Sequence, residues 1–117
     1  MRTFILFFLP LTLFAKSSFI TADEYAAQLY KNPRGIGCQH CHGNSGEGKL
    51  IAEYVHKNKK KSFNGPSIDS VTYRAFYIAL SERKKGMPRY FLTDKEIEAL
   101  YLHVHKEKTQ KKIKDAK

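Results

Sequence analysis

The segment from Gly35 to Gly43, GIGCQHCHG, holds both cysteines of this 117-residue chain, and a histidine follows the second. A disulfide between Cys38 and Cys41 would close a very short loop. The stabilisation that a disulfide provides grows with the length of the loop that it closes, so structural cross-linking explains this pair poorly. The two cysteines therefore indicate a chemical site, and the rest of the chain has to fold around it.

An apolar leader precedes the rest of the chain. Met1 and Arg2 are followed by an apolar run over residues 4–14, which ends at Ala15. The run has about 11 residues, whereas a membrane-spanning helix needs roughly 20. A basic start, a short apolar run and a small residue at its end are typical of a secretory signal peptide. We predict a signal peptide over residues 1–15 and a periplasmic protein, with an uncleaved membrane anchor as the alternative.

What remains is enough for one small domain with a strong positive charge. We expect the domain over residues 16–105 and a basic tail over residues 106–117. Without the leader, 20 basic side chains stand against 11 acidic ones. Such a charge can indicate nucleic-acid binding, but export and the lack of a recognition motif argue against that class. Acidic protein surfaces or anionic lipid headgroups fit the charge better.

Helix signals appear at both ends of this domain. Thr21 with Glu24, and Thr93 with Glu96, have the spacing of a capping box, and each is followed by apolar residues three and four positions apart. A third helix is expected from about residue 70 to 83. No alternating strand pattern stands out, so the sequence predicts an all-α fold.

The segment over residues 43–68 fits this fold least well. It contains several glycines, a cluster of lysines and a turn at NGP, and only KLIAEYVHK is expected to form a short helix there. A long and weakly structured segment is unusual inside a compact domain. Such a segment is understandable if it wraps a large, flat, apolar cofactor that completes the core.

Cys-x-x-Cys-His is the attachment signature of c-type haem. Two thiols three positions apart at the start of a helix can each add to one vinyl group of the porphyrin, and His42 can then face the iron. A zinc site would need two further ligands, and a thioredoxin-like redox pair would follow a strand, for which the sequence gives no signal. We predict one covalently bound haem c, attached at Cys38 and Cys41, with His42 as an iron ligand.

Met87 is the predicted second iron ligand. It is the sole methionine outside the leader, and it lies in the polar segment KKGMPRYF rather than on an apolar helical face. A methionine opposite a histidine raises the haem potential and closes the iron to external ligands. Among the other histidines, His40 is too close to the cysteines to cross the ring, and His56 could reach the iron. His103 and His105, on the last predicted helix, are expected to be solvated or packed there.

With these residues in hand, the chain resembles the class I cytochromes c, in particular the small bacterial proteins with one haem. The resemblance extends from about Thr21 to His105 and rests on CQHCHGNSGEGK, NGPSI and GMPRYFLTDKEIEALYLHV, in the family's order. It implies an all-α cytochrome c fold of three to four helices around the haem, in which the first and last helices cross. It also implies that the Pro66 carbonyl accepts a hydrogen bond from the second ring nitrogen of His42. The lysine-rich middle segment and the basic tail depart from the family.

The predicted function is that of an electron carrier in a respiratory chain and not of an enzyme, because the filled axial positions leave no catalytic constellation. We expect a monomer whose redox partners have acidic docking surfaces, with an anionic membrane surface as a further contact. The alternatives are a haem-linked subunit, or a five-coordinate or bis-histidine haem protein that acts as a gas-binding sensor or weak peroxidase. The basic residues expected around the haem edge are Lys57, Lys59, Lys60, Lys61, Arg83, Lys84, Lys85 and Arg89.

Overall fold

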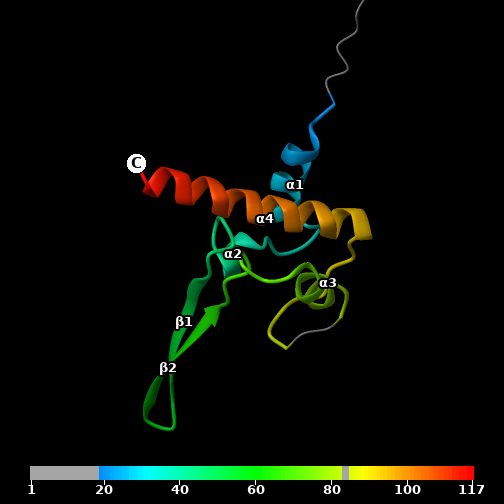
Figure 1. Cartoon of the computed structure of the whole chain (residues 1–117). Helices are drawn as coiled ribbons and strands as arrows, with labels where there is room; N and C mark the ends of the chain where they lie inside the picture. The colour runs from blue at the N-terminus through cyan, green and yellow to red at the C-terminus, as the bar shows by residue number, and fades with distance from the viewer. Residues whose placement is uncertain (1–18, 83–84) are drawn as a thin grey trace, which may run out of the picture.

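The computed structural model describes residues 19–82 and 85–117. The signal peptide predicted over residues 1–15, and Arg83 and Lys84 of the predicted basic collar, lie outside these residues. Within them, no helix is both long enough and apolar enough to cross a membrane. The elements in chain order are α1 (Ala22–Lys31), α2 (Gln39–His42), β1 (Lys49–His56), β2 (Lys59–Gly65), α3 (Tyr73–Ser81) and α4 (Asp94–Asp115) (Figure 1).

α1 and α4 begin at the two predicted capping boxes. The Thr21 hydroxyl accepts a hydrogen bond from the backbone N–H of Glu24 at 3.2 Å, and the Glu24 carboxylate accepts one from the Thr21 N–H at 2.9 Å. Thr93 and Glu96 make the same reciprocal pair at the start of α4. Each box supplies partners for N–H groups that the helix itself leaves unpaired. The third predicted helix is α3, which begins after its cap, Thr72.

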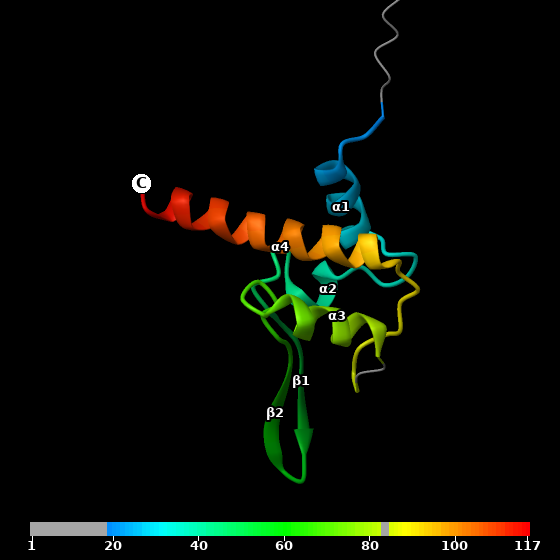
Figure 2. The ribbon, with the colours of Figure 1, turned by 45° about the vertical axis from the view of Figure 1, so that its right-hand side comes forward.

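The core lies where α1 and α3 pack on α4, and the crossing of α1 and α4 is visible in both ribbon views (Figures 1 and 2). In each helix, apolar residues three and four positions apart form the face that is buried. This core is small because the three helices also border a cavity, described below. The buried apolar side chains of the described residues are Ala26, Leu29, Tyr30, Phe76, Leu80, Ile97, Leu100 and Val104.

The prediction of an all-α cytochrome c fold is wrong. β1 and β2 pair as a two-stranded antiparallel sheet, so the fold is mixed, with four helices and one β-hairpin in the described residues. The short helix expected in KLIAEYVHK is strand β1. The weakly structured segment expected over residues 43–68 is therefore mostly a hairpin.

A two-residue turn accounts for the hairpin. Lys57 and Asn58 have φ angles of +48° and +59°. Positive φ at both central residues is typical of the type I′ turn, whose twist matches that of antiparallel strands. In addition, Ile51, Tyr54 and Val55 are the β-branched and aromatic residues that strands favour. The helical interpretation missed these signals because the lysines around the turn obscure the alternation of side chains.

The hairpin extends away from the helices (Figure 2). Every strand position except Gly65 is exposed. Its register pairs Ala52 with Phe63 and Tyr54 with Lys61, and the register slips by one residue between Leu50 and Ala52. Such a bulge bends a strand and redirects a side chain. Only the base of the hairpin therefore contacts the rest of the molecule.

α4 continues well beyond residue 105. The tail predicted over residues 106–117 is helical as far as Asp115. Its first part is fixed to other elements, because Lys106 pairs with Asp23 just after the start of α1, and Lys108 lies 3.5 Å from Asp69 before α3. The basic tail is thus largely an extension of the last helix.

Candidate functional site

A cavity of about 430 Å³ opens between α2, α3, the base of the hairpin and the loop after α3. Sites for small molecules and cofactors usually have volumes of about 300–1,000 Å³ and mostly apolar walls. All the site residues predicted from the sequence border this one cavity, namely Cys38, Cys41, His42, Pro66 and Met87. The fold thus brings together residues that lie up to 49 positions apart in the chain.

The walls of the cavity are mostly apolar. Val71, Ala75 and Ala79 repeat at helical spacing along and just before α3, and they present an apolar stripe to the cavity. Ile51 and Phe63 close it from the base of the hairpin. Protein interiors are otherwise packed about as densely as organic crystals, so an apolar cavity of this size calls for an apolar occupant.

α2 carries the two cysteines and the histidine into the cavity wall. Cys38 immediately precedes the helix, and its backbone N–H donates to the Tyr30 carbonyl at the end of α1 at 2.9 Å. The N–H of His42 donates to the Cys38 carbonyl, also at 2.9 Å. One turn of helix therefore places both sulfur atoms and the imidazole on the same wall.

Both thiols are free and half-buried. Burial raises the pKa of the Cys38 thiol to about 11, with a smaller contribution from Cys41. A thiol used for disulfide exchange needs a lowered pKa, because the thiolate is the nucleophile. In addition, α1 rather than a strand precedes Cys38. Both observations argue against a thioredoxin-like redox pair.

The orientation of His42 is fixed by a single hydrogen bond. The side chain is only 9% exposed, and Nδ1 lies 2.7 Å from the Pro66 carbonyl oxygen. A carbonyl oxygen can only accept, so Nδ1 must carry the hydrogen. The lone pair of the neutral ring is then on Nε2. This is the arrangement by which proteins orient a histidine that binds a metal.

Backbone hydrogen bonds on either side of Pro66 fix its position relative to α2. The Gly48 N–H donates to the His42 carbonyl at 2.7 Å, and the Ile68 N–H donates to the Gly46 carbonyl at 2.8 Å. At Gly65 the hairpin runs so close to α2 that an added Cβ atom would overlap the carbonyl oxygen of Cys41. The end of β2 thus places the Pro66 carbonyl next to His42.

Met87 lies on the loop between α3 and α4, where it is partly buried against the core. The preceding Gly86 has a φ of +83°, which glycine adopts without strain. The ring of Phe63 approaches to 3.5 Å of where a Cβ on Gly86 would lie, so the base of the hairpin covers this loop. Lys85 and Pro88 also border the cavity.

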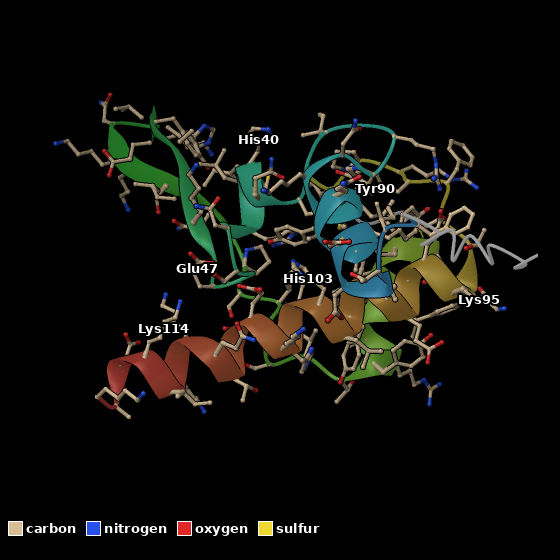
Figure 3. The ribbon with its side chains drawn as sticks, turned by 90° about the horizontal axis from the view of Figure 1, so that it is seen from above. His40, Glu47, Tyr90, Lys95, His103 and Lys114 are labelled. Carbon is tan, nitrogen blue, oxygen red and sulfur yellow. The ribbon has the colours of Figure 1, made fainter. Side chains whose placement is uncertain are left out.

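All five histidines lie in the described part of the chain, and among them only His42 borders the cavity. His40 is exposed on α2 (Figure 3), and His56 is at the far end of β1, beside the turn. The ring of His103 packs against Tyr30 with centroids 5.6 Å apart, and burial lowers its pKa. His105 bonds to the Tyr101 carbonyl of its own helix at 2.9 Å. The geometry therefore offers no second histidine to an occupant of the cavity.

Sequence reasoning missed two tyrosines of the cavity wall, Tyr30 and Tyr90. The Tyr30 hydroxyl donates to the Gly43 carbonyl at 2.6 Å in a buried position, and burial raises its pKa. Tyr30 follows Ala26 by four residues, so the helical pattern of α1 could have identified it. Tyr90 lies in a loop, where no periodic signal exists.

No protein-family model, curated protein or solved structure matches this chain. Assignment of a function therefore depends on the residues of the cavity.

These residues fit a c-type haem. The two thiols, an imidazole with its Nε2 lone pair available and a thioether border one apolar cavity. Residues 19–82 and 85–117 contain no group of three His, Cys, Asp or Glu side chains arranged to hold a metal ion. A zinc site needs about four such ligands.

Proposed function

We propose that this protein is a periplasmic electron carrier that holds one covalently attached haem c. The observation that supports the proposal is the convergence of Cys38, Cys41, His42 and Met87 on one apolar cavity. When bound, the haem iron gains and loses single electrons between its ferric and ferrous forms. The resemblance to the class I cytochromes c supports the cofactor and the ligands, although the mixed fold is not the all-α fold that the resemblance implied.

The two cysteines would attach the group. Each S–H would add across one vinyl C=C bond, with sulfur bonding to one carbon and hydrogen to the other, so the attachment would need no oxidant or reductant. Because α2 is a single turn fixed at Cys38 to the end of α1, the thiols are held at a constant separation. Covalent attachment also suits a domain whose own buried core is small.

His42 and Met87 would be the two side chains that bind the iron. Pro66 accepts the hydrogen of His42 Nδ1, which makes the ring a better electron donor and fixes its plane. Methionine ligation raises the reduction potential and excludes external ligands. With two side-chain ligands, the iron would exchange electrons rather than bind an external ligand, so we propose a carrier and not an enzyme.

The proposed partner is a redox protein with an acidic docking surface. The lysines around the hairpin turn, Lys57, Lys59, Lys60 and Lys61, are exposed, and the base of the same hairpin borders the cavity. Complementary charge increases the rate at which such transient partners meet. An anionic membrane surface is a second contact that this charge would favour.

Optical spectra of protein matured with haem in the periplasm test the ligands. We expect sharp bands in the reduced protein and, in the oxidised protein, the weak far-red band typical of methionine-ligated ferric haem. Met87→Ala should abolish the far-red band, whereas His56→Ala, at the far end of β1, should leave it unchanged.

Binding of carbon monoxide to the reduced protein is the result that would contradict the carrier. If the reduced wild-type protein binds carbon monoxide readily at neutral pH, a face of the iron is open and the gas-binding alternative replaces the carrier. If the far-red band disappears in His56→Ala, or is absent from the wild type, Met87 is not the ligand.

A further inference from the structure

The loop that carries Met87 has no regular secondary structure from Gly86 to Thr93. Its position therefore depends on what its side chains and carbonyls bind. Two contacts join it to the segment that leads into Cys38. One is made by Tyr90 and the other by Arg34.

Tyr90 bonds to the backbone just before the cysteines. Its hydroxyl donates to the Ile36 carbonyl at 2.6 Å, although the two residues are 54 positions apart. Its ring lies against Gly35, where an added Cβ would be 3.4 Å from the ring. Burial, with smaller contributions from the two cysteines, raises the pKa of Tyr90 to about 12, so the hydroxyl remains a donor at neutral pH.

Arg34 makes the second contact with the loop, and it also binds α4. One guanidinium nitrogen, Nη2, donates to the Phe91 carbonyl at 2.7 Å and to Glu96 Oε2 at 2.7 Å, and Nη1 donates to Glu96 Oε1 at 3.0 Å. Paired bonds from a guanidinium to a carboxylate fix direction as well as distance. Arg34 also has a φ of +60°, which is uncommon for a residue other than glycine and is kept only where neighbouring contacts enforce it.

We propose that Tyr90 and Arg34 are positioning residues that latch the Met87 loop to the cysteine segment. The latch joins residues 34–36, just before Cys38, to residues 90–91, just after Met87. Both hydrogen bonds must break before the loop can move away from the cavity. That the latch positions an iron ligand, Met87, rests on the proposed function. That it restrains the loop does not.

Hydrogen exchange in the holoprotein tests the latch. Tyr90→Phe removes one hydroxyl and retains the ring, and a hydrogen bond of this kind typically contributes enough to change a local opening equilibrium roughly tenfold. We expect amide exchange over residues 85–92 to accelerate by about that factor, with α1 and α4 unaffected. Tyr73→Phe is the matched control, because Tyr73 is exposed and packs edge-on against Tyr101, outside the cavity wall. Arg34→Lys, which loses the paired geometry, should accelerate exchange over the same residues.

Spectra of the same variants separate the latch from the ligand assignment. Both Tyr90→Phe and Arg34→Lys should weaken the far-red band at temperatures where Tyr73→Phe retains it. Unchanged exchange over residues 85–92 in both variants would overturn the latch, and so would faster exchange throughout the molecule, which indicates general destabilisation. Faster exchange confined to this loop, in a protein whose wild type lacks the far-red band, would uphold the latch and reject Met87 as a ligand.

Discussion

The plane of the His42 ring is set by a hydrogen bond to the backbone carbonyl of Pro66, and the proline side chain takes no part in it. Substitution of Pro66 therefore leaves the acceptor in place, and the path of the backbone through Gly65 matters more. Gly65 lies against Cys41 with no room for a side chain. The residue that aligns the imidazole is thus a glycine one position before the acceptor.

We predict that Gly65→Ala lowers the free energy of unfolding by about 1–3 kcal/mol, as overpacking of a closely packed site usually does. The added methyl group must push the end of β2 away from α2, and the Pro66 carbonyl moves with it. Urea unfolding followed by circular dichroism measures the loss. Gly35→Ala is the control, because its new Cβ would only touch the Tyr90 ring, at 3.4 Å. Equal effects of the two substitutions would show that the approach of Gly65 to Cys41 is not a special constraint.

At the scale of elements, the start of α4 joins three segments through one carboxylate. Glu96 completes the capping box with Thr93, pairs with Arg34 and accepts a hydrogen bond from the Tyr25 hydroxyl of α1 at 2.7 Å. These contacts, with the Arg34 hydrogen bonds the largest, hold the pKa of Glu96 at about 2. Glu96, in the first turn of α4, thus also joins α1 and the cysteine segment to this helix.

Glu96→Gln should destabilise the fold in a pH-dependent way. A carboxyl whose pKa is lower in the folded state stabilises the fold above its unfolded pKa, about 4.3, and the stabilisation is lost as the pH falls through the folded pKa. We expect a cost of about 1 kcal/mol at pH 7, since the ion pair is partly exposed to solvent, and a difference from wild type that shrinks from about pH 4.3 to about pH 2. Urea titrations at a series of pH values measure it. Glu98→Gln, exposed on the same helix, should show no such trend, and a pH-independent cost in Glu96→Gln would contradict the assignment.

Two of the hairpin lysines, Lys59 and Lys61, lie on the strand face that reaches the cavity at Phe63. Lys59, Lys61 and Phe63 alternate along β2 and so share one face, and Phe63 borders the cavity. Reversing both charges, Lys59→Glu with Lys61→Glu, should slow reduction of the oxidised protein by hexacyanoferrate(II) roughly tenfold at low ionic strength. The difference should vanish at high salt, because the charges are then screened.

Stopped-flow mixing over a range of salt concentrations gives these rates. The matched control reverses Lys112 and Lys114, in the last turn of α4, and therefore makes the same change in net charge. Equal slowing in the two double variants would mean that total charge, rather than the hairpin, governs the approach of an anionic reagent.

The helices could be predicted from the sequence because their signals are local. Thr21 with Glu24, and Thr93 with Glu96, fix two helix starts within four residues each. The hairpin could not be separated from a short helix in the same way. Its two-residue turn at Lys57 and Asn58 depends on left-handed backbone angles that lysine does not suggest, and its strands are exposed, so no buried alternation marks them.

In the whole molecule, the cavity is formed by some residues that are close in the sequence and by others that are far apart in it. Cys38, Cys41 and His42 could be assigned together because one helical turn sets their spacing. Met87 required the argument that a lone methionine stands in a polar loop. The contacts of Tyr90 with Ile36 and of Arg34 with Glu96 were beyond prediction, since they join segments more than 50 residues apart that share no pattern.

The proposed function requires that Cys38 and Cys41 covalently hold one haem. The most direct measurement is the intact mass, under denaturing conditions, of protein produced in the periplasm of a host able to attach haem. We expect the mass of residues 16–117 plus one haem for the wild type, and the mass of the polypeptide alone for the double variant Cys38→Ala with Cys41→Ala. A wild-type mass without haem would rule out covalent attachment, and so would haem that dissociates from the denatured chain.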